Sequence, residues 1–148
     1  MSNPVLPDTE AVMVEWAKNN AAITALVALR IATELPPEPT FPFLTAFRVG
    51  GGPIAGNALI DRALIQWDCW GMKTRDASLL ARTLVREAFE VDMTGGKYVS
   101  FTSSDDDPVT TTGWVYGMEV VQGPRRVPEP ETRRGRFIVE TFVTVRGE

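Results

Sequence analysis

The sequence contains no histidine and only one cysteine, Cys69. Histidine is the commonest general base and the commonest metal ligand near neutral pH, so its absence disfavours much of hydrolytic and metal-dependent chemistry. A single cysteine cannot form an intramolecular disulfide, and as a nucleophile it would need a base beside it. We therefore expect no catalytic residue, no metal site and no cofactor, and we interpret Cys69 as a small buried hydrophobe.

Long apolar runs and an excess of positive charge are also missing. No run approaches the roughly 20 apolar residues of a membrane span, and the opening MSNPVLPD lacks the basic start and apolar core of a secretory signal. The formal net charge is -4, whereas tight binding to a phosphate backbone depends on clustered Lys and Arg. We expect a single domain over residues 1–148 that is kept in a cytoplasm, contacts no membrane and does not bind DNA directly.

The stretch from Asp61 to Val91 predicts the pair of elements around which the chain is organised. Its first part alternates in polarity, which is typical of a half-buried strand with Asp61 and Asp68 among its polar residues and with one apolar face, made of Ala63, Ile65, Trp67 and Cys69. Its second part predicts an amphipathic helix, because apolar residues recur at spacings of three and four: Ala77, Leu80, Leu84, Ala88 and Val91. We expect Thr74 to cap this helix, which then folds onto the strand.

The N-terminal third predicts two further helices and a strand. Asp8 to Asn20 has the apolar spacing of a helix with Asp8 as its cap, and Ala21 to Leu26 favours a second helix before an extended Val27 to Ile31. The proline-rich stretch TELPPEPTFP predicts a stiff loop. PFLTAFRVGG then predicts a strand that ends at Gly50 to Gly52, a triple glycine that we interpret as a hairpin turn rather than a phosphate loop.

The C-terminal half predicts three strands, KYVSFTS, TTTGWVYGMEVVQGP and GRFIVETFVTVRG. Alternation places Trp114, Tyr116, Met118 and Val120 on one face of the second of these strands. In the third, alternation likewise groups Phe137, Val139, Val143 and Val145. The whole order predicts an α+β fold, with an antiparallel-rich mixed sheet and two or three helices packed on one face.

Two charged segments are the candidate interaction sites. The segment from Arg125 to Arg136 predicts a long exposed hairpin loop, either simply solvated or acting as a subunit or tube interface through five arginines: Arg125, Arg126, Arg133, Arg134 and Arg136. The run Asp105, Asp106 and Asp107 does not match a calcium loop and predicts a solvated acidic turn. Three tryptophans, Trp67, Trp70 and Trp114, indicate packing rather than a stacking platform for nucleic acid.

The assembled pattern resembles the tail terminator proteins of long-tailed bacteriophages, particularly those of actinobacteria. The resemblance is carried by PDTEAVMVEWAK, PFLTAFRVGGG, DRALIQWDCWG with its helix ASLLARTLVREAF, and GWVYGMEVVQGPRR. It implies a small α+β protomer in a hexameric ring at the head-proximal end of the tail tube. Such a ring stops tube polymerisation and joins the tail to the head, contacting the tail tube protein and a head completion or connector protein.

The resemblance also implies where the acidic turn lies, because genomic DNA must pass through the ring. Asp105 to Asp107 facing the lumen would repel phosphates, so the DNA passes without specific binding. Neighbouring connector proteins are similar in size and also form rings, so a head completion ring is the first alternative. The others are a small enzyme or ligand-binding domain that uses paired carboxylates, and a nucleic-acid module that uses Arg125 to Arg136.

Overall fold

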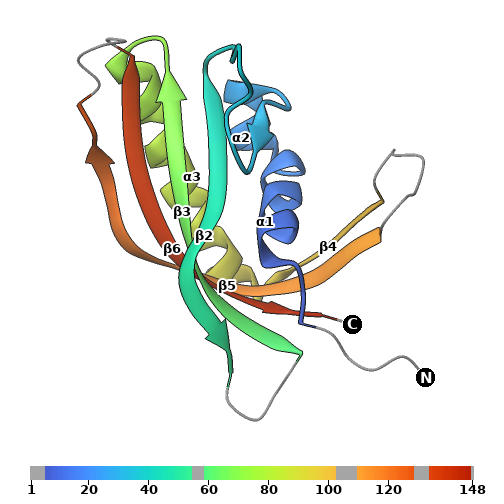
Figure 1. Cartoon of the computed structure of the whole chain (residues 1–148). Coiled ribbons are helices and arrows are strands. Elements are labelled where there is room, and N and C mark those ends of the chain that lie inside the picture. Colours follow the sequence, from blue (N-terminus) through green and yellow to red (C-terminus); the bar gives the residue numbers. More distant parts are fainter. Residues whose placement is uncertain (1–5, 55–58, 103–109, 129–133, 148) are drawn as a thin grey trace.

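The structure is a computed structural model that describes residues 6–54, 59–102, 110–128 and 134–147. Three helices pack against one face of a six-stranded curled sheet (Figure 1), which confirms the predicted α+β fold. The helices are α1 (Thr9–Lys18), α2 (Ala21–Val27) and α3 (Thr74–Thr94). The strands are β1 (Ile31–Ala32), β2 (Phe43–Pro53), β3 (Ile60–Gly71), β4 (Lys97–Thr102), β5 (Thr110–Arg126) and β6 (Gly135–Arg146).

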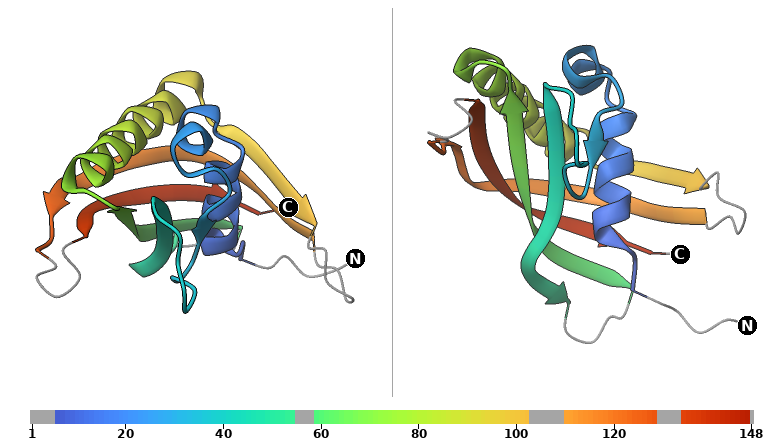
Figure 2. Two further views of the ribbon diagram at one scale, coloured as in Figure 1. Left: turned by 90° about the horizontal axis from the view of Figure 1, so that it is seen from above. Right: turned by 45° about the horizontal axis from the view of Figure 1, so that its top comes forward.

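The strand order across the sheet is β1-β2-β3-β6-β5-β4, so β1 and β4 are the two edges. Only the β1–β2 pair is parallel, and every other neighbouring pair is antiparallel. The sheet curls strongly along its length (Figure 2). The long helix α3 packs across β5, β6 and β3, with its most extensive contact on β5, whereas α1 packs on β2 and its neighbours.

The predicted pairing of a central strand with a long helix is confirmed. The four residues of the expected apolar face of β3 are fully buried: Ala63, Ile65, Trp67 and Cys69. α3 buries the stripe expected from its spacing: Ala77, Leu80, Leu84, Ala88 and Val91. Trp16 of α1 packs edge-on against Trp67, with ring centroids 5.9 Å apart. Apolar burial of this kind stabilises the two layers against each other.

The beginning of α3 differs from the prediction. Thr74 is the first helical residue. Lys73 occupies the N-cap position, and its side chain makes no capping hydrogen bond. The cause is the tight turn at Gly71, where an added Cβ would lie 2.6 Å from the backbone nitrogen of Ala77. That close approach leaves room for only two residues between β3 and the helix. At the other end Gly95 adopts a left-handed conformation (φ 82°) and ends the helix.

The two N-terminal helices are confirmed, with short polar caps. The Asp8 carboxylate accepts a hydrogen bond from the backbone nitrogen of Ala11 at 3.3 Å. The Asn20 side chain accepts one from the backbone nitrogen of Ile23 at 3.1 Å and thereby begins α2. Both are N-caps of the ordinary kind. The extended stretch that was expected after α2 is reduced to the two residues of β1.

The triple glycine lies inside a strand, so its prediction as a hairpin turn was wrong. β2 runs through Gly50, Gly51 and Gly52 to Pro53 and stays paired with β3, with a bulge after Arg48. Gly51 has φ 82°, and an added Cβ would lie 2.2 Å from the Arg62 carbonyl oxygen. Glycine is therefore required there for the bulge and for close strand contact, not for a turn.

The predicted common face of β5 is divided between the two sides of the sheet. Val115 faces Val145 and Gly117 faces Thr144, so Tyr116 is an extra residue in a bulge. An extra residue changes which face the alternation buries. Met118 is consequently buried, as expected, while Trp114 and Tyr116 are 36% and 40% exposed.

Candidate interaction surfaces

The side of the sheet that carries no helix is the surface where polar and aromatic side chains gather. It is called the open face here. Residues of β3 with even numbers point to it, and the register places Trp70 opposite Arg136, Leu64 opposite Phe142 and Ile60 opposite Arg146. Arginine and aromatic residues thus occupy both ends of β6 on this face. These residue types are enriched where proteins meet.

One end of the open face holds an arginine cluster, made of Phe41, Asp68, Trp70, Arg134 and Arg136. The Arg136 guanidinium donates a hydrogen bond to Asp68 at 2.7 Å and lies 4.7 Å from the Trp70 ring centroid. Arg134 lies 4.3 Å from the centroid of Phe41. Asp68 is buried, at 4% exposure, so this ion pair is largely removed from water. The cluster therefore stabilises the protomer and also forms part of its surface.

This geometry corrects the prediction of one long arginine loop. Arg125 and Arg126 belong to β5, where they face Ile138 and Phe137, and Arg136 belongs to β6. The β5 strand continues past Pro124 because Gly123 adopts φ 98°, at a point where an added Cβ would lie 2.4 Å from the Ile138 carbonyl oxygen. Arg136 pairs within the protomer with Asp68, 68 positions away in the sequence.

Several predicted site residues lie outside the described part of the chain. They are Arg133 and the acidic run of Asp105, Asp106 and Asp107. The run falls between the end of β4 and the start of β5, which pair as an antiparallel hairpin. The roles proposed for these residues stay predictions. Arg125 and Arg126 are exposed on the hairpin of β5 and β6, as an interface role requires.

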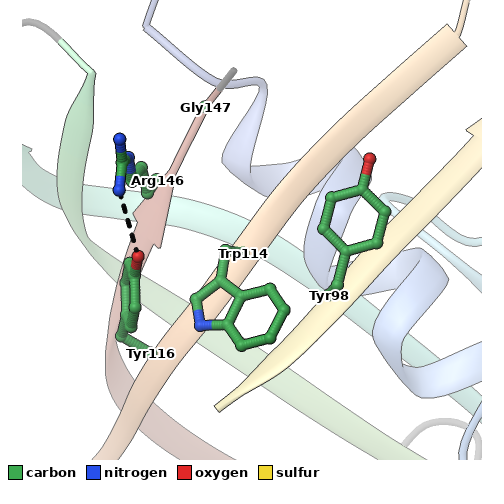
Figure 3. A pocket seen from close by; sticks show the side chains of 5 residues that line it. All are labelled: Tyr98, Trp114, Tyr116, Arg146 and Gly147. Carbon is green, nitrogen blue, oxygen red and sulfur yellow. Dashed lines mark hydrogen bonds between the residues drawn. The ribbon is translucent and has the colours of Figure 1, made fainter.

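The other end of the open face holds an aromatic hollow that the sequence did not predict. Tyr98 of β4, Trp114 and Tyr116 of β5, and Arg146 and Gly147 at the end of β6 line a hollow of about 240 Å³ (Figure 3). The Trp114 centroid lies 6.1 Å from that of Tyr98 and 6.0 Å from that of Tyr116. Arg146 donates a hydrogen bond of 3.5 Å to the Tyr116 hydroxyl. Trp114 and Tyr116 lie on the same face because Val115 between them is buried, and the bulge after Val115 returns Met118 to the core.

Behind the hollow, on the helical face, lies a buried ionic network that links α1 to the sheet. Asp61 is fully buried, whereas the sequence placed it among the polar residues of the strand. Its carboxylate accepts hydrogen bonds from both terminal nitrogens of Arg48 and from the Thr9 hydroxyl. Burial alone would raise the pKa of Asp61, but these hydrogen bonds and the charge of Arg48 outweigh it and hold the pKa below its ordinary value.

The chemistry of the remaining candidates is limited. Cys69 is fully buried, and burial, with the nearby charge of Asp68, raises the pKa of its thiol. Across residues 6–54, 59–102, 110–128 and 134–147, no group of three or more Cys, Asp or Glu is placed to hold a metal ion. None of the helices in the same ranges is long and apolar enough to cross a membrane.

Comparisons with known proteins find the fold but no family. No protein-family model and no curated protein sequence matches the chain. Among solved structures, the chain is similar to one described as "Virion of native gene transfer agent (GTA) particle". The TM-score is 0.56 and the identity 14%, over 93% of this chain and 94% of that one. The match covers nearly all of both chains, so it concerns the whole fold rather than a shared fragment.

Proposed function

We propose that this chain is a structural virion protein, without catalysis, that forms a ring at the head-proximal end of a bacteriophage tail tube. The observation that carries the proposal is the match of its whole fold with a chain of a gene transfer agent virion. The sequence resemblance to tail terminators, strongest in PFLTAFRVGGG and IQWDCWG, supports the same position.

In this proposal the ring stops polymerisation of the tail tube and provides the surface that joins tail to head. Its partners are the tail tube protein on one side and a head completion or connector protein on the other. Six copies form the ring by head-to-tail contacts. Such contacts give a closed ring when the rotation from one copy to the next adds up to a full turn, and an open filament otherwise. The protein is assembled in the host cytoplasm and stays in the virion.

The proposed ring leaves a lumen through which the genome passes without specific binding. Asp105, Asp106 and Asp107 face that lumen and repel phosphates. Arg125, Arg126, Arg133, Arg134 and Arg136 lie toward a neighbouring subunit or the tube. The exposure of Arg125 and Arg126 on a β-hairpin supports this part of the proposal. The burial of the Arg136 ion pair assigns that residue a role within the protomer as well.

A head completion ring of the same phage neck is the second candidate. The fold match favours it equally, because the matched structure is described as a whole virion and names no position within it. The two candidates differ in what loss of the protein does to the tail. A missing terminator leaves tubes that continue to grow, whereas a missing head completion protein leaves tails of normal length that do not join heads.

The test is to disrupt the gene in the phage that carries it and to measure tail lengths by electron microscopy. The terminator proposal expects a broad distribution of abnormally long tails, restored to one length by supplying the protein in trans. Unattached tails of uniform length would support the head completion ring instead. Particles that lack the chain by mass spectrometry, with normal tails after disruption, would contradict both.

A further inference from the structure

The aromatic hollow has the composition of a recognition site but is too small for an ordinary ligand. Its volume of about 240 Å³ lies below the roughly 300–1,000 Å³ typical of small-molecule pockets. Three aromatic rings from two strands line it, each 36% exposed or more. A hollow of this size accepts one or two side chains of an extended segment. Prolines are the side chains that aromatic grooves commonly bind, since a proline-rich segment is already stiff.

The charge of the hollow indicates what should lie beside those prolines. Arg146 is exposed, and its only described polar contact is the Tyr116 hydroxyl at 3.5 Å. Within the described ranges no carboxylate pairs with it, in contrast to Arg48, Arg62 and Arg136. A cation next to exposed aromatic rings favours a segment that combines proline with an acidic residue.

The chain itself carries such a segment between β1 and β2, here called the proline-rich segment (residues 33–40). Its sequence is TELPPEPT, with acidic residues at Glu34 and Glu38. Both glutamates are exposed, as are Pro36 and Pro37. The structure shows no ion pair for either glutamate among its described residues. The end of the segment is held in place, because Arg30 donates a hydrogen bond of 2.8 Å to the Pro42 carbonyl oxygen.

The segment and the hollow cannot meet within one copy. The segment joins β1 to β2 at one edge of the sheet, and the hollow is formed by β6, β5 and β4 at the other edge. Four strands, β2, β3, β6 and β5, lie between β1 and β4 in the order of the sheet. In Figure 1 the connection from β1 to β2 lies in the upper part of the molecule and the C-terminal end of β6 in the lower part. Each copy therefore presents both halves of a contact that only a second copy can complete.

We propose that the proline-rich segment of one copy docks in the aromatic hollow of the next, with Glu34 or Glu38 beside Arg146. Pro36 and Pro37 would lie on the rings of Trp114 and Tyr116. Their fixed φ angles reduce the entropy lost on docking. Because the two surfaces differ, the contact is heterologous and can repeat from copy to copy around a ring. The inference deepens the proposed ring and rests on it only for the number of copies that close.

The test uses two full-length variants, each with one surface broken by charge reversal. The segment variant carries Glu34→Arg and Glu38→Arg and keeps its hollow, whereas the hollow variant carries Arg146→Glu and keeps its segment. In the mixture the unchanged hollow of the segment variant can bind only the unchanged segment of the hollow variant, so signals from that labelled hollow report this contact alone. With the segment variant labelled with ¹⁵N at millimolar concentration, adding the unlabelled hollow variant should shift signals of Tyr98, the Trp114 indole and Tyr116. No shift of these signals would overturn the proposal.

A second, quantitative experiment measures self-association of the charge-reversal variants and of the chain that combines them. Sedimentation of the wild-type chain should show self-association, weakened about tenfold or more by Arg146→Glu or by the paired Glu34→Arg and Glu38→Arg. The chain with all three changes should recover most of the loss, since the charges are again opposite. Glu90→Arg, at an exposed residue of α3, is the matched charge control. Equal weakening by the control, or no recovery in the combined variant, would contradict the contact.

The outcomes separate this contact from the proposed function. Signal shifts and recovery with purified protein, together with particles that lack the chain, would uphold the contact and reject the virion role. A chain found at the tail end whose variants neither shift nor recover would uphold the role and reject the contact. Signals that move with an unrelated acidic proline-rich peptide but not with the hollow variant would reject a second copy as the occupant.

Discussion

Arg136 and Arg146 lie at opposite ends of β6 and both face the side of the sheet without helices, yet only Arg136 is part of the internal packing. Arg136 pairs with buried Asp68 and lies over Trp70, and its side chain is 22% exposed. Arg146 is exposed, and within the described ranges it donates one hydrogen bond, to the Tyr116 hydroxyl. The same residue type thus stabilises the protomer at one end and is available to a partner at the other. Arg136 belongs to the internal packing because its carboxylate partner, Asp68, is buried.

The largest expected effect is at the internal end of the strand. Asp68→Ala should lower the free energy of unfolding by about 3 kcal/mol, because it leaves the Arg136 guanidinium largely buried without its carboxylate. Urea unfolding measures the change. Glu119→Ala is the control, since Glu119 and Arg62 form an ion pair whose side chains are 65% and 45% exposed. The control should lose no more than about 1 kcal/mol. Equal losses in the two variants would contradict the comparison.

The next effect concerns Asp61, behind the aromatic hollow. Asp61→Asn should lower the free energy of unfolding at pH 7 by about 1.5–3 kcal/mol, the range for hydrogen bonds to charged groups. The pKa of Asp61 in the folded protein lies below its ordinary value of 3.8. Its contribution is therefore complete above that ordinary value and is lost as pH falls through the folded pKa.

Urea unfolding of wild type and Asp61→Asn between pH 7 and pH 2 checks this prediction. The difference between the two proteins should shrink as the pH falls below about 4, since the wild-type carboxylate then gains a proton in the unfolded state first. Comparing two proteins at each pH cancels the titration of the other carboxylates. A difference that stays constant across the range would show that Asp61 contributes no charge interaction.

A smaller effect is expected at Arg134, beside the arginine cluster. Its guanidinium lies over Phe41, a contact worth about 0.5–1 kcal/mol at an exposed site. Arg134→Ala should therefore change the melting temperature only slightly. If the arginines contact a neighbour or the tube, changing Arg133 and Arg134 together to Ala should produce tails that are abnormally long or do not join heads. Normal infectious particles would leave these two arginines as solvated surface.

The smallest effect on folding is expected at the other end of the strand. Arg146→Ala should change the free energy of unfolding by no more than about 0.5 kcal/mol, as is usual for exposed side chains without buried partners. Self-association should nevertheless weaken in the same variant. Thermal melting and sedimentation on one sample measure both properties. A large loss of stability at Arg146 would remove the contrast with Arg136.

The candidate sites were less predictable from the sequence than the elements that hold them. Alternation and helical spacing identified β3, β6 and α3 with their buried residues, because both patterns follow from local backbone geometry. The arginine segment was predicted as one loop because Pro124, Pro128, Pro130 and Gly135 interrupt it. The hollow was missed because Trp114 and Tyr116 were predicted to share one face with Met118. Gly117 was the sequence signal that could have revealed it, because a glycine inside a strand often marks a bulge, and the bulge does lie beside it.

What the sequence by itself determined is the set of elements, the buried stripes of β3 and α3, and the absence of histidine chemistry. These depend on residue type and on neighbours within a few positions. Only the tertiary structure decided that Tyr116 turns outward and that Asp61 is buried under Arg48 and Thr9. It also decided that Arg136 pairs with Asp68, while Arg146 has no carboxylate partner among the described residues. The reason is physical: strand register and bulges bring together residues far apart in sequence, and burial then determines the strength of each charge interaction.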